Sequence, residues 1–218
     1  MLHELLNALE ETLFMVFSAG LLTWVMGLPI GALLSVTNTG KILENKLIYK
    51  TLHFCIHTMR SLPYIVFMIA MIPFTQFLVG AYEGCIAAVV PLTLAAIPYF
   101  AQLSEKALNR IQPGIIEAAK AVGASPFQII YKVLIPEALP NIIKALTLTL
   151  VHLIGYSTIA GAIGAGGLGS LMIYKGYHAF HFDYVFATAV ILIALIHIIQ
   201  FSGHYIASGN MNRNSTAL

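Results

Sequence analysis

The sequence predicts an all-α integral membrane protein that crosses the bilayer five times. Two observations lead to this prediction: 59% of the 218 residues are hydrophobic and only 9% are charged, and the charged residues leave five long stretches without any. A soluble domain with so little charge could not cover its surface with polar groups, whereas a bilayer stabilises an apolar exterior. We therefore interpret residues 1–218 as a single transmembrane domain.

Each charge-free stretch is long enough for the roughly 20 residues that an α-helix needs to cross the hydrocarbon core. The predicted spans are approximately 12–36, 61–80, 85–104, 145–161 and 184–206. We expect the fourth span to end near Gly161, because the glycines that follow favour a turn. In the first span, Gly27 and Gly31 are spaced for the close approach of another helix, and Pro29 predicts a kink.

The positions of lysine and arginine predict the orientation of the chain. These residues gather after the first span and between the third and fourth, and only Lys175 falls on the other side. Because basic residues mark cytoplasmic loops, we expect the N-terminus outside and the C-terminus inside. Every acidic or basic residue lies outside the predicted spans or at their edges. This distribution argues against a carrier driven by an ion gradient.

The longest polar segment, residues 105–144, predicts two short helices on the cytoplasmic side. The first begins at Pro113 and ends at Gly123, which suits a left-handed C-terminal cap. The second has Ser125 as its N-cap, a proline in the next position and Gln128 to complete a capping box. We expect this loop to join its two helices by a sharp turn.

Both short helices have an apolar face. The two sets of residues are Ile115, Ala118, Ala119 and Val122 in the first, and Phe127, Ile130, Tyr131 and Leu134 in the second. Faces of this size are not left in water. From periodicity alone, they are expected to rest on the cytoplasmic ends of the membrane helices or in the lipid interface. The second helix is expected to close before Pro136.

The loop resembles the EAA loop of ABC importer permeases. Glu117-Ala118-Ala119 is followed after three residues by Gly123, and a three-residue apolar close precedes Pro136. In that family the loop forms a coupling helix, which docks into a cleft on a separate ATPase subunit. The resemblance implies a coupling role for eight residues: Glu117, Ala118, Ala119, Lys120, Gly123, Ser125, Pro126 and Pro136. A sharp turn at the glycine would let a push pass between two rigid helices.

Further stretches narrow the resemblance to permeases for methionine uptake and extend it over nearly the whole chain. They are Arg60-Ser61-Leu62-Pro63, Met71-Ile72-Pro73-Phe74-Thr75, Val90-Pro91-Leu92-Thr93, Gly155-Tyr156-Ser157 and Gly164-Ala165-Gly166-Gly167-Leu168-Gly169. The resemblance implies a multi-pass inner-membrane subunit that imports methionine and related amino acids by alternating access. It also implies a homodimer around a central pathway, two ATP-binding cassette ATPase subunits that hold ATP and magnesium, and a periplasmic or lipid-anchored methionine-binding protein.

Several residues are candidates for the substrate pathway or its gate. They are Met68, Met71, Tyr156, Ser157, Thr158, Gly161, Gly164 and Gly166. The first five suit a thioether and an amino-acid backbone, although such residues are also common in ordinary helix packing. The glycines lie on the predicted outer side, where they form a gate, a landing site for the binding protein or a plain flexible loop.

We expect no catalytic site and no metal site in this chain. It has no phosphate-binding G-x-x-x-x-G-K-[ST] motif and no nucleophile beside a base, so ATP hydrolysis is expected on the partner chain. The ligand-type residues His178, His181 and Asp183 occur in an aromatic outer loop, and His152 and His197 are interpreted as packing residues. The basic residues are too dispersed for nucleic-acid binding.

Three alternatives remain open at the level of sequence. The first is an ABC permease for a different small solute, which the coupling loop fits equally well. The second is an ion-coupled secondary transporter or a channel, which the uncharged spans disfavour. The third is a purely structural membrane subunit, which would leave the coupling loop without a purpose.

Overall fold

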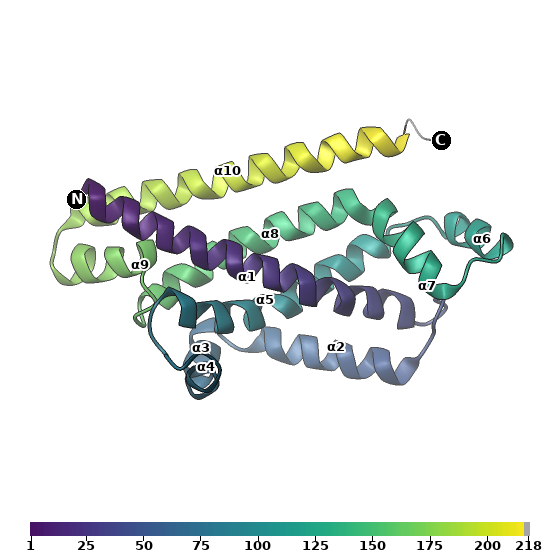
Figure 1. The fold of residues 1–218 in the computed structure, drawn as a ribbon, viewed down its shortest axis with the longest axis horizontal. Helices are drawn as coiled ribbons and strands as arrows, with labels where there is room; N and C mark the ends of the chain where they lie inside the picture. The colour runs from purple at the N-terminus through teal and green to yellow at the C-terminus, as the bar shows by residue number, and fades with distance from the viewer. Residues whose placement is uncertain (216–218) are drawn as a thin grey trace.

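The computed structural model describes residues 1–215, which form an all-helical bundle. Its long helices are α1 (Leu2–Thr37), α2 (Lys46–Ser61), α5 (Cys85–Leu108), α8 (Ile135–Gly161) and α10 (Phe182–Ser215). Its short helices are α3 (Tyr64–Ala70), α4 (Ile72–Val79), α6 (Pro113–Ala121), α7 (Pro126–Ile129), η1 (Ile130–Leu134), α9 (Gly167–Leu171) and η2 (Met172–His178). The long helices run roughly along one direction, with α6 and α7 at one end and α9 at the other (Figure 1).

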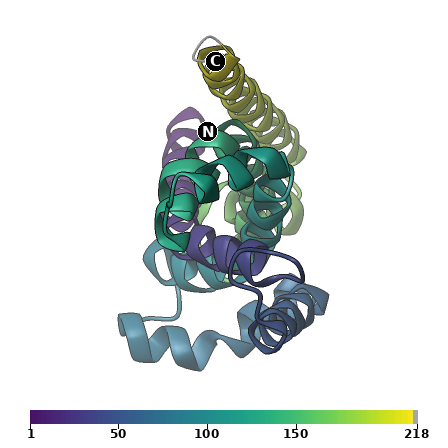
Figure 2. The same ribbon diagram turned by 90° about the vertical axis from the view of Figure 1, so that its right-hand side faces the viewer.

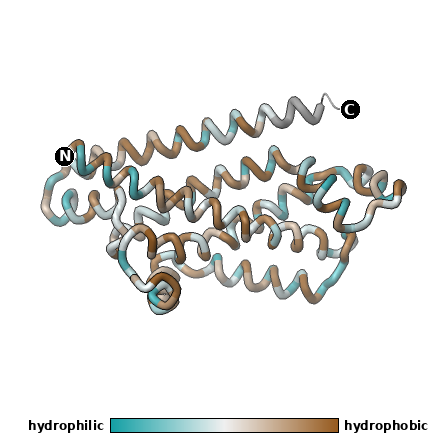
Figure 3. Tube along the Cα trace, in the orientation of Figure 1, coloured by the Kyte–Doolittle hydropathy of each residue, from teal (hydrophilic) through white to brown (hydrophobic). Residues whose placement is uncertain are grey.

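Four helices of the described chain are long and apolar enough to cross a membrane: α1, α5, α10 and the continuous helix formed by α7, η1 and α8. A fifth crossing results if α2 and α3, which meet at a bend of 101°, form one broken span. Apolar residues occur along the whole length of these helices (Figure 3). The predicted class, an all-helical membrane protein, is confirmed. α1 begins at the α9 end of the bundle, and α10 finishes near the α6 end (Figure 1).

α1 and α5 approach each other closely at two glycines. A Cβ atom on Gly27 would lie 2.9 Å from Phe100 Cδ1, and one on Gly31 would lie 2.6 Å from the carbonyl oxygen of Ala101. A larger residue would push the two helices apart, so the predicted role of these glycines in close helix packing is confirmed. Pro29 lies between them inside α1, and the helix continues past it.

The second crossing differs from the single helix expected over 61–80. α2 comes before that range and packs against α1 and α5. It ends at Ser61. The next residue, Leu62, has an extended backbone because the ring of Pro63 disfavours the helical conformation at the preceding residue. α3 and α4 then run across the direction of α2 (Figures 1 and 2). The search for charge-free stretches missed α2 because this helix carries three basic residues.

α7, η1 and α8 form one helical path from Pro126 to Gly161. The expectation that the second loop helix closes before Pro136 is therefore wrong. The π-helical turn η1 is the physical reason, since the amide of Ile135 donates to the carbonyl of Ile130, five residues back. This wider turn lets the helix continue past a residue that has no amide hydrogen to donate. The predicted end of the fourth span near Gly161 is confirmed.

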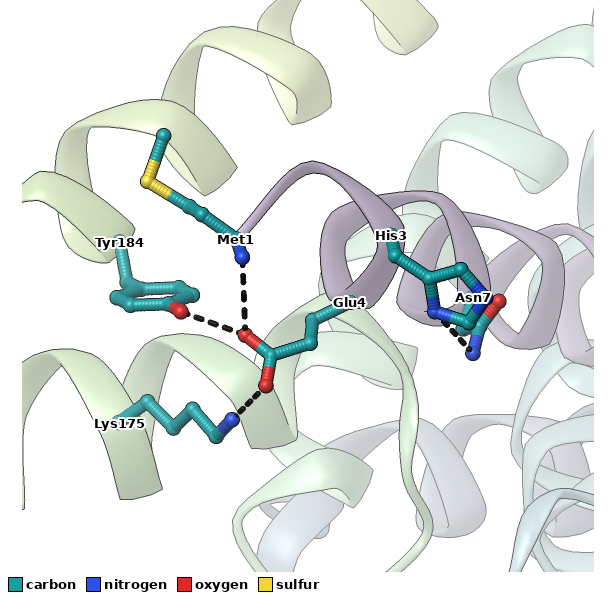
Figure 4. A network of polar contacts seen from close by, with 6 residues as sticks. All are labelled: Met1, His3, Glu4, Asn7, Lys175 and Tyr184. Atoms are coloured by element: carbon teal, nitrogen blue, oxygen red, sulfur yellow. Dashed lines mark hydrogen bonds and ion pairs between the residues drawn. The ribbon is translucent and has the colours of Figure 1, made fainter.

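A polar network ties the first turn of α1 to η2 and α10 (Figure 4). The Glu4 carboxylate accepts hydrogen bonds from the Lys175 ammonium and from the Tyr184 hydroxyl, the latter at 2.5 Å. It also lies 3.6 Å from the N-terminal amine of Met1. The pKa of Lys175 is raised, mainly because its ammonium donates to this carboxylate. The network fixes the end of the bundle at which α1 begins.

Candidate functional site

The segment between α5 and α8 projects from one end of the bundle (Figure 1). The chain turns after α6 at Gly123, whose φ of +80° is the left-handed conformation expected there. The Ser125 hydroxyl accepts from the Gln128 amide at 3.4 Å, and the Ser125 amide donates to the Gln128 side chain at 2.9 Å. The predicted turn and capping box are confirmed. We call residues 109–134 the coupling segment.

The covered face of α7 and η1 differs from the predicted one. The side chains that face the bundle are Ile129, Ile130, Val133 and Leu134, which pack among residues of α1, α5 and α8. Two apolar stripes run along this helix and share Ile130 and Leu134. Spacing alone does not decide between them, and the packing of the bundle covers the stripe that contains Ile129 and Val133.

Three large apolar side chains of the coupling segment are exposed. Val122 is 84% exposed, Phe127 75% and Tyr131 66%. The rings of Phe127 and Tyr131 lie nearly parallel, with centroids 6.5 Å apart. We call these three residues the coupling patch. A patch of this kind next to polar residues is typical of a surface that binds another protein.

The residues of the EAA motif lie beside the coupling patch on α6. Glu117, Ala118 and Lys120 are exposed, and Ala119 is half-buried. Small exposed side chains permit the close approach of a partner, and the carboxylate offers it a hydrogen-bond acceptor. Pro136 is also exposed but lies in the first turn of α8.

α5 and α8 leave an uncovered seam between them. Its central part is a pocket of about 110 Å³ whose lining includes Arg60, Tyr64, Tyr99, His152 and Tyr156. The part of the seam nearest the coupling segment is a second pocket, whose lining includes Lys106, Arg110, Asn141, Lys144 and Leu148. We call this face the α5–α8 seam. Its polar and charged lining contrasts with the exposed apolar side chains of α10, such as Phe186 and Val190.

Four aromatic side chains form the central part of the seam. The rings of Tyr64 and Tyr156 stack with centroids 4.0 Å apart, and those of Tyr99 and His152 stack at 4.6 Å. His152 Nε2 lies 3.2 Å from the Tyr156 hydroxyl and joins the two stacks. The rings come from α3, α5 and α8, so they depend on the packing of three helices.

Arg60 reaches this cluster from the end of α2. Its Nη1 donates to Gln102 Oε1, and its guanidinium carbon lies 5.3 Å from the centroid of the Tyr99 ring. Tyr99 belongs to the predicted span 85–104. The positive charge of Arg60 therefore lies beside a membrane-spanning helix and not beyond its end. The sequence analysis had placed this charge at the edge of 61–80, because it did not include α2 in the crossing.

Of the predicted pathway side chains, only Tyr156 lines the central pocket. Met68 is buried in the core of the bundle. The hydroxyl groups of Ser157 and Thr158 donate to backbone carbonyls of α8, which satisfies them within their own helix. Met71 is half-buried where α3 meets α4. A pathway role for these four stays a prediction.

The predicted gate glycines Gly161, Gly164 and Gly166 belong to a packed turn between α8 and α9. Gly164 and Gly166 have φ of +90° and +86°. The amide of Gly167 donates to Glu11 Oε2 at 2.6 Å, and a Cβ atom on Gly166 would lie 2.7 Å from the same oxygen. The turn is therefore attached to α1, and a plain flexible loop does not describe it.

Sequence reasoning missed Arg60, Tyr64, Tyr99 and His152 as candidate site residues. His152 stacks on Tyr99 and lies within hydrogen-bond distance of the Tyr156 hydroxyl, which agrees with its interpretation as a packing residue, but its side chain is also exposed in the seam. One signal was available, because His152 and Tyr156 are four residues apart and share one face of a helix. In residues 1–215, no three His, Cys, Asp or Glu side chains come together as metal ligands would.

A projecting, capped helical segment joined to an apolar helical bundle with a polar seam is the arrangement expected of a membrane transport subunit. The family model described as "Binding-protein-dependent transport system inner membrane component" matches residues 27–210. The chain belongs to this family, and it is a multi-pass, non-catalytic inner-membrane subunit.

Several similar proteins are methionine permeases. The chain is 45% identical over 199 residues to the probable D-methionine transport system permease protein MetI of Vibrio cholerae, which covers 91% of this chain and 88% of the relative. It is 40% identical over 207 residues to the methionine import system permease protein MetP of Bacillus subtilis. The alignment covers 95% of this chain and 93% of the relative. A solved chain of the MetNI methionine ABC transporter in an inward-facing conformation has a TM-score of 0.95 and 43% sequence identity to this chain. The superposition covers 96% of this chain and 97% of the solved chain. The resemblance to the methionine uptake family is confirmed.

Proposed function

We propose that this chain is the permease subunit of an ATP-driven importer for methionine and related amino acids. The similarity to methionine permeases over most of the chain supports the substrate class. The observation that carries the mechanism is the continuous helix from Pro126 to Gly161. A push on α7 moves α8 as a rigid body, and α8 forms one wall of the seam.

The proposal includes the orientation and the partners of the chain. The coupling segment faces the cytoplasm, where two copies of an ATPase subunit hold ATP and magnesium and contact the coupling patch. Lys106, Arg110 and Lys144 line the neighbouring end of the seam, which agrees with a cytoplasmic position. The N-terminus and the α8–α9 turn then face outward, where a periplasmic or lipid-anchored methionine-binding protein delivers the substrate.

The α5–α8 seam is the proposed pathway. Polar side chains at membrane depth face protein or a water-filled cavity and avoid lipid. One chain leaves the seam uncovered, so a second copy of the chain is the simplest cover. A homodimer with facing seams encloses a central polar pathway whose two walls carry the same residues.

The coupling patch provides a direct test of the proposed function. We expect the double substitution Phe127→Ser and Tyr131→Ser to weaken retention of the ATPase about tenfold or more in co-purification, because exposed aromatic residues are frequent hot spots of interfaces. Tyr177→Ser is the matched control, since Tyr177 is also exposed but belongs to η2 at the opposite end. Equal retention of the ATPase by both variants would contradict the assignment of the patch.

The substrate is tested with the intact complex in proteoliposomes. We expect methionine-loaded binding protein to stimulate ATP hydrolysis and methionine uptake. Stimulation by some other solute alone would overturn the methionine assignment and keep the permease class. Methionine uptake that follows an ion gradient without ATP would instead favour a secondary transporter.

A further inference from the structure

We infer that Arg60 binds the carboxylate of the amino-acid substrate midway along the seam, while the substrate side chain lies on the neighbouring rings. This inference rests on the proposed function and names the group that recognises the substrate. Two observations support it: an arginine without an acidic partner, and stacked rings in the same pocket.

Arg60 has unused binding capacity. Among the described residues, the ion pairs involve only Glu4 and Glu44 as acids, and neither of them pairs with Arg60. A guanidinium has five N–H donors, of which one is used on Gln102. The Tyr99 ring covers one face of the group and Gln102 holds one edge, so the remaining donors are held ready in place. A carboxylate is the small group that matches this fork with two parallel hydrogen bonds.

The ring stacks explain the preference for an apolar side chain. Tyr64 with Tyr156 and Tyr99 with His152 present aromatic surface next to the guanidinium. Thioether sulfur makes favourable contacts with aromatic rings. The pocket of about 110 Å³ is smaller than the roughly 300–1,000 Å³ of complete small-molecule sites. One chain therefore supplies part of the site, and the facing copy completes it.

The inference is tested first by chemical footprinting of the purified complex. Phenylglyoxal modifies exposed arginines, and Arg60 is exposed. We expect saturating methionine to slow modification of Arg60 at least threefold, whereas methioninamide, which lacks the carboxylate, leaves the rate unchanged. Equal protection by both compounds, or protection by neither, would overturn the inference.

The second test measures ATP-driven methionine uptake by substituted complexes. We expect Arg60→Gln to lower uptake at least tenfold and Arg60→Lys to restore part of it, because lysine keeps the charge without the fork. Lys50→Gln removes one positive charge from the same helix outside the pocket and is expected to keep uptake at the wild-type level. Equal uptake by Arg60→Gln and Lys50→Gln would overturn the inference.

The two tests separate this inference from the proposed function. If wild-type vesicles fail to accumulate methionine, the proposed function is wrong. The wild-type complex alone decides this point, and no variant of Arg60 is needed. If wild-type vesicles accumulate methionine but the footprint of Arg60 ignores the carboxylate, the proposed function stands and the inference fails.

Discussion

Two basic side chains of this protein have opposite surroundings. Lys175 donates to Glu4 and belongs to a network that closes one end of the bundle (Figure 4). Arg60 has an amide and a ring beside it but no carboxylate among the described residues. At the residue scale, Lys175 has a structural role, whereas Arg60 has hydrogen-bond donors left for a ligand. Lys175 is also the one basic residue that the charge pattern predicts on the outer side.

The role of Lys175 is open to measurement by hydrogen exchange. Replacing Lys175 with glutamine removes the ammonium donor to Glu4, and we expect amides in the first turns of α1 to exchange about two- to fivefold faster. The raised pKa means that the Lys175 contribution is complete below the ordinary value of 10.5 and is lost only as the pH rises above it. The difference in protection between the wild type and Lys175→Gln should therefore be constant between about pH 6 and pH 9. Mass spectrometry of exchanged peptides checks both expectations.

Lys41→Gln is the matched control for this measurement. Lys41 is exposed near the other end of α1 and loses the same charge. Equal effects of the two substitutions on the first turns of α1 would mean that the network with Glu4 does not hold this end of the helix.

At the scale of elements, the helix from α7 through η1 to α8 shows how a proline-containing segment stays mechanically continuous. Pro136 would break a regular α-helix, and the π-helical turn before it removes the conflict. Gly123 has the opposite effect, because its left-handed backbone ends the first helix sharply. The result is a stiff rod attached to a sharp turn, which suits the transmission of a movement from α7 to α8.

The role of the turn at Gly123 can be tested by substitution. A Cβ atom there would meet nothing within 4 Å, so a substitution acts through backbone conformation alone. Gly123→Val forces a β-branched residue toward φ near +80°, at a cost of about 1–2 kcal/mol. We expect uptake in proteoliposomes to fall severalfold while ATP hydrolysis and binding-protein capture persist.

Gly123→Asn provides the comparison, because asparagine tolerates the left-handed conformation. It should transport at close to the wild-type rate. Unchanged transport by Gly123→Val would show that the sharp turn is not needed for coupling.

At the scale of the whole molecule, the bundle has two kinds of exterior. The outer face of α10 is apolar, with side chains such as Phe186 and Val190 largely exposed. The α5–α8 seam exposes His152 and several charged residues between apolar helices. Lipid suits the first surface, and the second requires water or protein.

The difference between these two surfaces predicts that hydrophilic reagents reach the α5–α8 seam more readily than the outer face of α10. In a background with Cys55 and Cys85 replaced by alanine, we expect a cysteine at Leu148 to react at least tenfold faster with a hydrophilic maleimide than a cysteine at Val190. Both positions are exposed apolar residues of long helices, but only Leu148 lines the seam. Equal rates in membrane vesicles would contradict the placement of the pathway at the seam.

The sequence by itself determined the features that depend on neighbouring residues. Charge-free stretches indicate the membrane class, and the Ser125 capping box and the turn at Gly123 appear in the structure as predicted. Such features follow from local backbone preferences and hydrogen bonds within a few residues. The EAA pattern is also contiguous, so the family could be identified before the fold was known.

Only the tertiary structure decided which surfaces are covered and which residues meet. Arg60 and Gln102 are 42 residues apart in sequence and belong to different helices. The stripe of α7 that faces the bundle, the true extent of α2 and the meeting of four rings in the seam likewise depend on helix packing. Periodicity describes the faces of one helix, but the neighbours of each face are set by burial and fit among several helices, which no local pattern contains.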